Sequence, residues 1–166
     1  MQYIKDIVKH FQISSDRTRV ALIIYGSEVH LTFGFNDFTS SNNLLQGLGS
    51  IKNDLNASKE PQFASVFAVA LIAFHESRSS SKALVLFTFA RDITQSNLMQ
   101  TFLSNTRTQG ISVSVVAMGN STSKLGLVSL VEHEHNLFSG DAADGEGVDV
   151  PWIVDFICQG TLYCFS

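Results

Sequence analysis

Hydrophobic and polar positions follow two different periods along the chain, and each period predicts one kind of element. Apolar runs at 20–25 and 83–87 and the mainly apolar stretch 111–118 are typical of strands that are buried on both faces. Residues 29–35 instead alternate between apolar and polar, which predicts a half-buried strand. This segment follows the run 20–25 after a polar turn at 26–28, so the two are expected to form an antiparallel hairpin.

Apolar residues at spacings of three and four separate these strands and predict amphipathic helices. In the segment 95–108, Leu98, Phe102 and Leu103 are expected to face inward, and Gly110 suits the carboxyl-terminal cap. Strands separated by helices in this way predict parallel crossovers in a sheet covered on both faces. The expected fold class is therefore α/β, a doubly wound and mostly parallel sheet with one antiparallel edge strand from the hairpin. The expected helices cover 3–11, 44–51, 61–74, 95–108, 125–131 and 152–157, and a short strand covers 137–138.

Length and charge limit the class of protein. The chain has 166 residues, enough for one domain with a buried core, and we expect a single domain over residues 1–160 followed by a short tail at 161–166. A net charge of −4 with scattered basic residues argues against binding to nucleic acid or to an anionic membrane. The longest apolar run, 66–74, is too short to cross a bilayer, and the first residues lack the pattern of a signal peptide.

Few motifs for catalysis or ligand binding are present. The sequence has no G-x-S-x-G nucleophile elbow and no glycine-rich phosphate loop, so we expect neither an enzyme nor a cofactor. His133-Glu134-His135 is a candidate zinc pair, but two imidazoles without a third ligand form a weak motif. A half-exposed start of a strand is the favoured interpretation there. The acidic segment 141–149 does not follow the EF-hand spacing, so a solvated loop is favoured over a calcium site.

Four stretches of the chain carry more specific patterns. They are RVALIIYGSEVHLTFGF (19–35), ALVLFTF (83–89), GISVSVVAMGN (110–120) and VPWIVDFICQG (150–160). In this order they resemble the second and third strands, the fourth strand, the fifth strand and the closing helix of a von Willebrand factor type A domain. The likeness extends from Tyr3 to Gly160 and implies a Rossmann-like fold that binds protein ligands where the strand ends meet loops.

The resemblance also implies where a metal site would lie, and the residues at those positions depart from the family pattern. The family holds a divalent cation with a D-x-S-x-S loop, a threonine before its third helix and an aspartate after its fourth strand. FASVFAVAL occupies the place of the T-x-T-G-x-A-L pattern, with Ser65 and Phe67 at the threonines and Ala68 at the glycine. Phe89 stands at the aspartate, and Asp92 follows three residues later. Because a hard cation needs oxygen ligands, we expect a degenerate adhesion site without a divalent metal.

The family's first strand has no counterpart, because Tyr3 to Phe11 resembles the helix that follows it. That strand would lie between the strands that 20–25 and 83–87 resemble. We expect the chain to be an N-terminally truncated fragment of a longer protein or gene model. The alternative is that these two strands close up on each other.

The leading functional interpretation is a non-enzymatic protein–protein interaction or adhesion module from an extracellular-matrix or cell-adhesion protein, with an extracellular or secreted localisation. Its partner would be a matrix or cell-surface protein, bound without a divalent metal, without nucleic acid and without membrane insertion. Phe89 is expected to fill the vacant metal position as a buried plug; if exposed, it would suit an anchoring contact. A doubly wound small-molecule or nucleotide-binding enzyme domain and a fragment without independent function stay open as alternatives. The candidate ligand-facing residues are Ser65, Phe89, Arg91, Asp92, Asn120 and Ser121.

Cysteines and glycosylation motifs depend on the cellular compartment. Cys158 and Cys164 are candidates for a disulfide that closes a small loop, and a reduced pair is expected if the protein is cytosolic. The resemblance implies a further alternative, in which Cys158 pairs with a cysteine upstream of Met1. Asn56 and Asn120 lie in glycosylation motifs that matter only in a secreted protein.

Overall fold

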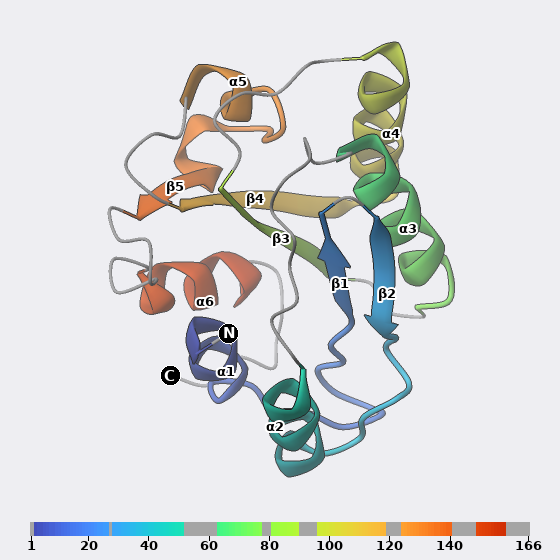
Figure 1. Cartoon of the computed structure of the whole chain (residues 1–166), viewed down its shortest axis with the longest axis vertical. Coiled ribbons are helices and arrows are strands. Elements are labelled where there is room, and N and C mark those ends of the chain that lie inside the picture. Colours follow the sequence, from blue (N-terminus) through green and yellow to red (C-terminus); the bar gives the residue numbers. More distant parts are fainter. Residues whose placement is uncertain are drawn as a thin grey trace. The chain divides into compact units, whose positions relative to one another are not determined.

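The chain folds into two units of helices and strands (Figure 1). The computed structural model describes residues 2–26, 28–51, 63–77, 81–89, 96–118, 124–140 and 149–158. Unit 1 comprises Met1–Gln62 together with Val150–Ser166, and unit 2 comprises Phe63–Asp149. The single domain over residues 1–160 stays a prediction.

Unit 1 contains the hairpin. Strand β1 (Leu22–Tyr25) pairs antiparallel with β2 (Val29–Phe33), and Tyr25 lies opposite Val29. The N–H of Gly26 closes the turn by donating to the carbonyl oxygen of Glu28 at 2.9 Å. The predicted antiparallel hairpin is therefore confirmed. All four side chains of β1 are half-buried rather than buried, because β1 is one of only two strands in its sheet among the described residues.

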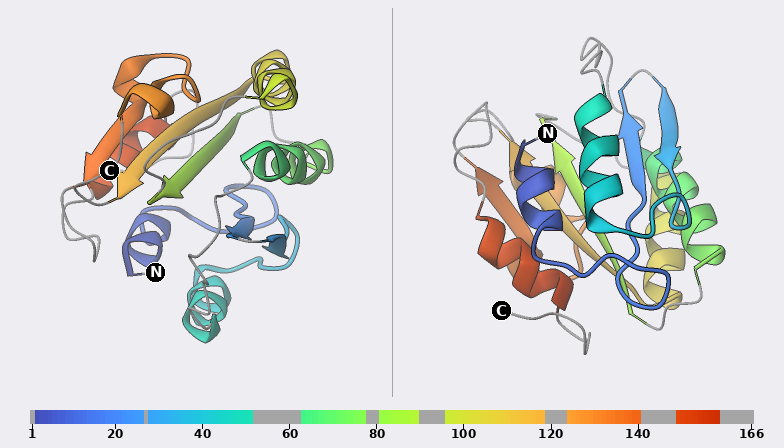
Figure 2. Two further views of the ribbon diagram at one scale, coloured as in Figure 1. Left: turned by 45° about the horizontal axis from the view of Figure 1, so that its top comes forward. Right: turned by 90° about the horizontal axis from the view of Figure 1, so that it is seen from below.

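Three helices complete unit 1. Helix α1 (Gln2–Val8) contacts both α2 (Ser41–Ser50) and α6 (Val150–Cys158) and lies between them (Figure 2). The Ser40 side chain caps α2 by accepting a hydrogen bond from the backbone N–H of Asn43. The three helices bury one apolar stripe each, which is why they fold here as amphipathic helices. The buried residues are Ile7 and Val8 of α1, Leu44 and Leu48 of α2, and Ile153 and Phe156 of α6.

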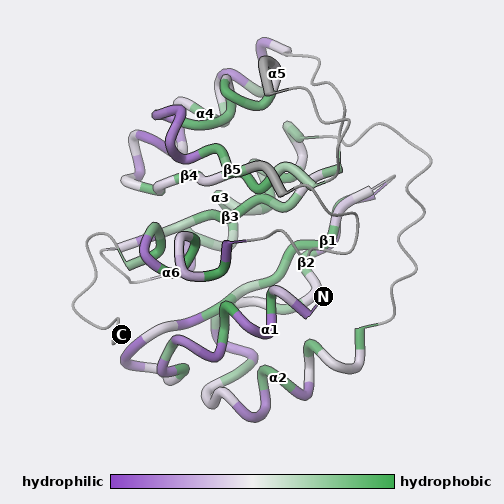
Figure 3. Tube along the Cα trace, turned by 90° about the vertical axis from the view of Figure 1, so that its left-hand side faces the viewer, coloured by the Kyte–Doolittle hydropathy of each residue, from purple (hydrophilic) through white to green (hydrophobic). Residues whose placement is uncertain are grey.

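Unit 2 contains the parallel sheet, with strand order β3 (Lys82–Thr88), β4 (Ile111–Met118) and β5 (Leu137–Gly140). Both pairs of neighbours are parallel, so the predicted crossovers are confirmed. The hydrophobic run along β3 is visible in Figure 3. Strand β4 has a neighbour on each side, and every residue of it except Ser112 is buried.

The helices of unit 2 are α3 (Phe63–His75), α4 (Asn97–Thr108) and α5 (Lys124–Val128), and the turn η1 (Glu134–Asn136) leads into β5. Helix α3 packs on α4, and both α4 and α5 contact β4. Met99 and Leu103 form the buried stripe of α4, whereas Leu98 is 58% exposed. The prediction that Leu98 faces inward is wrong, because this residue lies in the first turn and about 100° away from that stripe. Among the described helices, none is long and apolar enough to traverse a bilayer.

Candidate functional site

The carboxyl ends of the three parallel strands form one edge of unit 2. Thr88 of β3 lies opposite Ala117, and Met118 of β4 lies opposite Gly140. We call this region, with Phe89 directly after β3, the carboxyl edge. In open α/β sheets, ligands bind outside the carboxyl ends of the strands, so the carboxyl edge is the candidate functional site.

Phe89 is the prominent side chain of the carboxyl edge. It is 58% exposed, whereas Thr88 directly before it is 2% exposed and Met118 is 2% exposed. The last residue of β3 with a partner in the register is Thr88, so Phe89 lies beyond the part of the strand that β4 covers. The prediction that Phe89 is a buried plug is therefore wrong. The alternative, an exposed side chain suited to an anchoring contact, agrees with the structure.

The residues that align with family metal ligands do not form a matching donor set. Ser65 is half-buried in the first turn of α3, where it could offer a hydroxyl oxygen. Phe67 is fully buried in the core, and Phe89 presents only hydrocarbon. A hard divalent cation needs oxygen ligands, and carboxylates supply most of its electrostatic attraction. These three positions supply a single oxygen-bearing side chain, so they do not fit the cation that the fold family implies.

Several predicted site residues lie outside the described part of the chain. They are Arg91, Asp92, Asn120 and Ser121 among the ligand-facing candidates, Asn56 among the glycosylation candidates, and Cys164. Cys158, at the end of α6, is in a disulfide bond. Its pairing with Cys164 stays a prediction, as do the roles of the other residues.

Two histidines that the sequence singled out lie together on unit 2. The rings of His133 and His135 are stacked, with their centroids 5.2 Å apart and their planes 9° from parallel. Both side chains are exposed, and the turn that carries His135 leads directly into β5. The segment was expected to be the half-exposed start of a strand; it is instead an exposed turn that directly precedes the strand.

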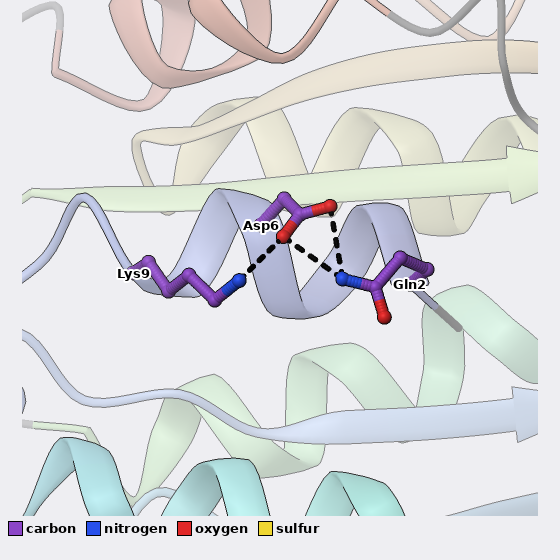
Figure 4. Close-up of polar contacts among 3 residues, drawn as sticks. All are labelled: Gln2, Asp6 and Lys9. Atoms are coloured by element: carbon purple, nitrogen blue, oxygen red, sulfur yellow. Dashed lines mark hydrogen bonds and ion pairs between the residues drawn. The ribbon is translucent and has the colours of Figure 1, made fainter.

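A cluster of charged and polar side chains lies on α1, in unit 1 (Figure 4). The Asp6 carboxylate accepts hydrogen bonds from Lys9 Nζ at 2.7 Å and from Gln2 Nε2 at 3.0 Å. These two donors, Lys9 first, lower the pKa of Asp6 below its ordinary value. The cluster is open to solvent and its members belong to one helical segment, so it stabilises α1 rather than forming a site.

A buried hydrogen bond was not evident from the sequence. The hydroxyl of Ser114 in β4 donates to the carbonyl oxygen of Asn136 at 3.0 Å. The signal that could have revealed it is a serine in the interior of a mainly apolar strand; in the structure this serine is 0% exposed, and buried polar groups are in general hydrogen-bonded.

Comparisons with known proteins agree with this architecture. A family model for the von Willebrand factor type A domain matches residues 1–147. A comparison with curated proteins finds no match.

Solved structures with the same fold come from distant proteins. Proximal thread matrix protein 1 from the mussel byssus superposes with a TM-score of 0.81 at 13% identity, over 95% of this chain and 41% of that one. The vWF domain of the type V pili tip protein Mfa5 from Porphyromonas gingivalis gives 0.74 at 10% identity, over 99% and 89% of the two chains. The manganese-loaded TRAP protein of Plasmodium vivax gives 0.67 at 10% identity, over 93% and 63%. At these identities the likeness establishes the fold alone, and the chain spans 41% of the length of the byssus protein.

Proposed function

The chain belongs to the von Willebrand factor type A domain family, and on that premise we propose that it is a non-enzymatic adhesion module that binds a matrix or cell-surface protein without a divalent metal. Domains of this family are in general protein-interaction modules. The observation that carries the proposal is Phe89, which is 58% exposed at the carboxyl edge. Its position is the one at which the family pattern has a metal-binding aspartate.

In this proposal the exposed phenyl ring of Phe89 makes an apolar anchoring contact with the partner protein, in place of the contact through a metal ion that the family pattern implies. Aromatic side chains are enriched among the residues that dominate binding energy, and they act best when they enter a pocket of the partner. Thr88 and Met118 beside it are buried in the sheet, so they hold the end of β3 in place. A rigid support of this kind lowers the conformational entropy that binding would otherwise cost.

An extracellular localisation follows from the same proposal. Two of the similar structures are, by name, a thread matrix protein of the mussel byssus and a pilus tip protein. These names describe surface or matrix proteins, and they support an external role for this chain at the level of the family only.

Binding to immobilised matrix proteins tests the proposal. The purified chain would be applied to surfaces coated with collagen, fibronectin or laminin, in buffer with Mg²⁺ and Mn²⁺ and in buffer with EDTA. We expect saturable binding to at least one coat, with the same affinity in both buffers, and at least tenfold weaker binding by Phe89→Ala, or about 1.4 kcal/mol. Absence of saturable binding, or its loss in EDTA, would contradict the proposal.

Ile72→Ala is the matched control. Ile72 is 64% exposed and lies near the end of α3, which leads toward the start of β3 and so away from the carboxyl edge. This variant removes a comparable exposed apolar side chain and should bind like the unaltered chain. If both substitutions weaken binding equally, the effect is not specific to the carboxyl edge and the assignment of Phe89 is wrong.

A further inference from the structure

The stacked imidazoles of His133 and His135 form a second candidate site on unit 2. Their centroids are 5.2 Å apart and their planes are 9° from parallel, and both side chains are exposed. We propose that this pair, which we call the histidine pair, chelates one divalent transition-metal cation of the kind that prefers imidazole nitrogen, namely Zn²⁺, Cu²⁺ or Ni²⁺. The site is separate from the carboxyl edge and from the family's adhesion site.

The backbone places both rings on one side of the chain. His133 has an extended conformation, with φ −132° and ψ 142°, and the next three residues form the turn η1. The result is that two side chains separated by Glu134 stand face to face. A shared ion requires each ring to direct one nitrogen to a point about 2.0–2.1 Å away. Exposed side chains can rotate about their own bonds to do so without a change in the backbone.

The segment that carries the histidine pair is held at both ends. On one side Leu130 and Val131 are buried, at 1% and 5% exposure. On the other side Asn136 is buried, its N–H donates to the carbonyl oxygen of His133 at 2.9 Å, and its own carbonyl oxygen accepts the hydroxyl of Ser114 at 3.0 Å. Only the residues between these anchors point outward. A chelating pair whose backbone is already fixed loses less entropy when it binds an ion.

The charges around the histidine pair favour a cation. Glu132 and Glu134 are exposed on either side of His133, while Arg107 brings one positive charge to the same segment through its bond of 3.4 Å to the carbonyl oxygen of Val131. Two negative charges against one positive charge attract a divalent ion to this surface.

Two nitrogens and solvent make up the coordination that we propose. Within the described residues, no group of three or more His, Cys, Asp or Glu side chains is arranged to hold a metal. The ion is therefore held by two imidazoles, and water molecules complete its coordination shell. An arrangement with open positions is typical of exchangeable metal sites rather than of structural zinc, which has four protein ligands.

Titration of the untagged, full chain with ZnCl₂, NiCl₂ and CuSO₄ tests the proposal, using calorimetry for affinity and NMR for the histidine ring signals. We expect saturable binding of one ion per chain by at least one of the three metals. The ring signals of His133 and His135 should shift together. His133→Ala and His135→Ala should each weaken binding at least about tenfold, or about 1.4 kcal/mol, because one imidazole cannot chelate.

Two sets of variants give the controls. His10→Ala and His75→Ala each remove an exposed histidine elsewhere and should leave the affinity unchanged. The exchange Glu134→His with His135→Glu keeps the composition but places the two imidazoles on adjacent residues, so it should weaken binding as much as the single alanine variants. Absence of saturable binding, or a loss smaller than about tenfold in either alanine variant or in the exchange, would overturn the proposal. Because His10, His75, His133, Glu134 and His135 are all exposed, circular dichroism should report an unchanged fold for every variant.

Discussion

The hydroxyl of Ser114 donates a hydrogen bond of 3.0 Å to the carbonyl oxygen of Asn136, and both residues are buried. The bond connects the middle of β4 to the turn η1, which directly precedes β5. A buried acceptor that loses its donor keeps its desolvation cost without compensation. We therefore expect Ser114→Ala to lower the free energy of unfolding by about 1–3 kcal/mol, as measured by urea denaturation.

Ser112→Ala is the control for this prediction. Ser112 lies on the same strand, but it is the exposed position of β4. Its substitution should change the free energy of unfolding by less than about 0.5 kcal/mol. Equal effects at the two serines would show that the buried hydrogen bond contributes nothing specific.

Phe67 and Phe89 should respond to alanine substitution in opposite ways. Phe67 is 0% exposed and Phe89 is 58% exposed. Removal of a buried phenyl ring leaves a cavity, so Phe67→Ala should lower the free energy of unfolding by about 3–5 kcal/mol. Phe89→Ala should lower it by less than about 1 kcal/mol, since surface substitutions have small effects. Urea denaturation of both variants measures this difference, and a large loss for Phe89→Ala would mean that this side chain belongs to the core.

The order of elements could be predicted from the sequence because it depends on local periods. The alternation of 29–35 and the apolar run of 83–87 each predict a strand, and both strands formed. Their burial differs from the expectation, because Leu31 of β2 is 43% exposed and most side chains of β3 are half-buried rather than buried. The exposure of Phe89 and Leu98 could not be predicted in this way. Each is an apolar residue beside the end of an element, and its burial depends on where β3 stops and where α4 begins.

The buried contact between Ser114 and Asn136 shows the same limit. The two residues are 22 positions apart, and they meet only because β4 and β5 pair in a particular parallel register. Hydrophobic patterns identify strands, but a mainly apolar strand that is buried on both faces lacks the clear alternation that helps to set the register of pairing. For His133 and His135, in contrast, the sequence already suggested a candidate zinc pair, and the structure adds the stacked geometry of the two rings.

The pKa of Asp6 should depend on its two hydrogen-bond donors. It is lowered from the ordinary value of 3.8, first by the bond from Lys9 and then by the bond from Gln2. Lys9→Ala should therefore raise this pKa toward 3.8, and Gln2→Ala should raise it less. The change in pKa is measured by NMR, from the chemical shift of the Asp6 carboxyl carbon as the pH is varied. Lys5→Ala, which removes a lysine from the same helix, should have no effect, and an unchanged pKa in Lys9→Ala would contradict the assignment.

The sign of the associated stability effect follows from the direction of this shift. A carboxyl group whose pKa is lower in the folded chain stabilises the folded state at pH values above its unfolded pKa. That contribution is lost as the pH falls through the lowered, folded value. Asp6→Asn should therefore reduce the free energy of unfolding near neutral pH and leave it unchanged in strong acid. Because the Asp6 side chain is open to solvent, with 39% of its surface exposed, we expect a small effect. A larger loss of stability in acid than at neutral pH would contradict the sign.

Gly110 should tolerate substitution poorly, and the reason is its backbone. Its φ is +67°, just after the end of α4, and its N–H donates to the carbonyl oxygen of Arg107 at 2.9 Å. A Cβ at this position would meet no atom within 4 Å, so a cost of substitution comes from the left-handed conformation alone. We expect Gly110→Ala to lower the free energy of unfolding by about 1–2 kcal/mol, and Gly110→Asn to lower it less, because asparagine adopts this conformation more readily.

Gly34→Ala separates this conformational effect from a general effect of glycine replacement. A Cβ at Gly34 would also meet no atom within 4 Å, but the backbone there has no positive φ. Alanine should then leave the free energy of unfolding unchanged or raise it by up to about 1 kcal/mol, because it restricts the unfolded chain. Urea denaturation of the three variants gives the comparison. If Gly34→Ala and Gly110→Ala lose the same stability, the left-handed conformation is not the cause, and the cap of α4 would need another explanation.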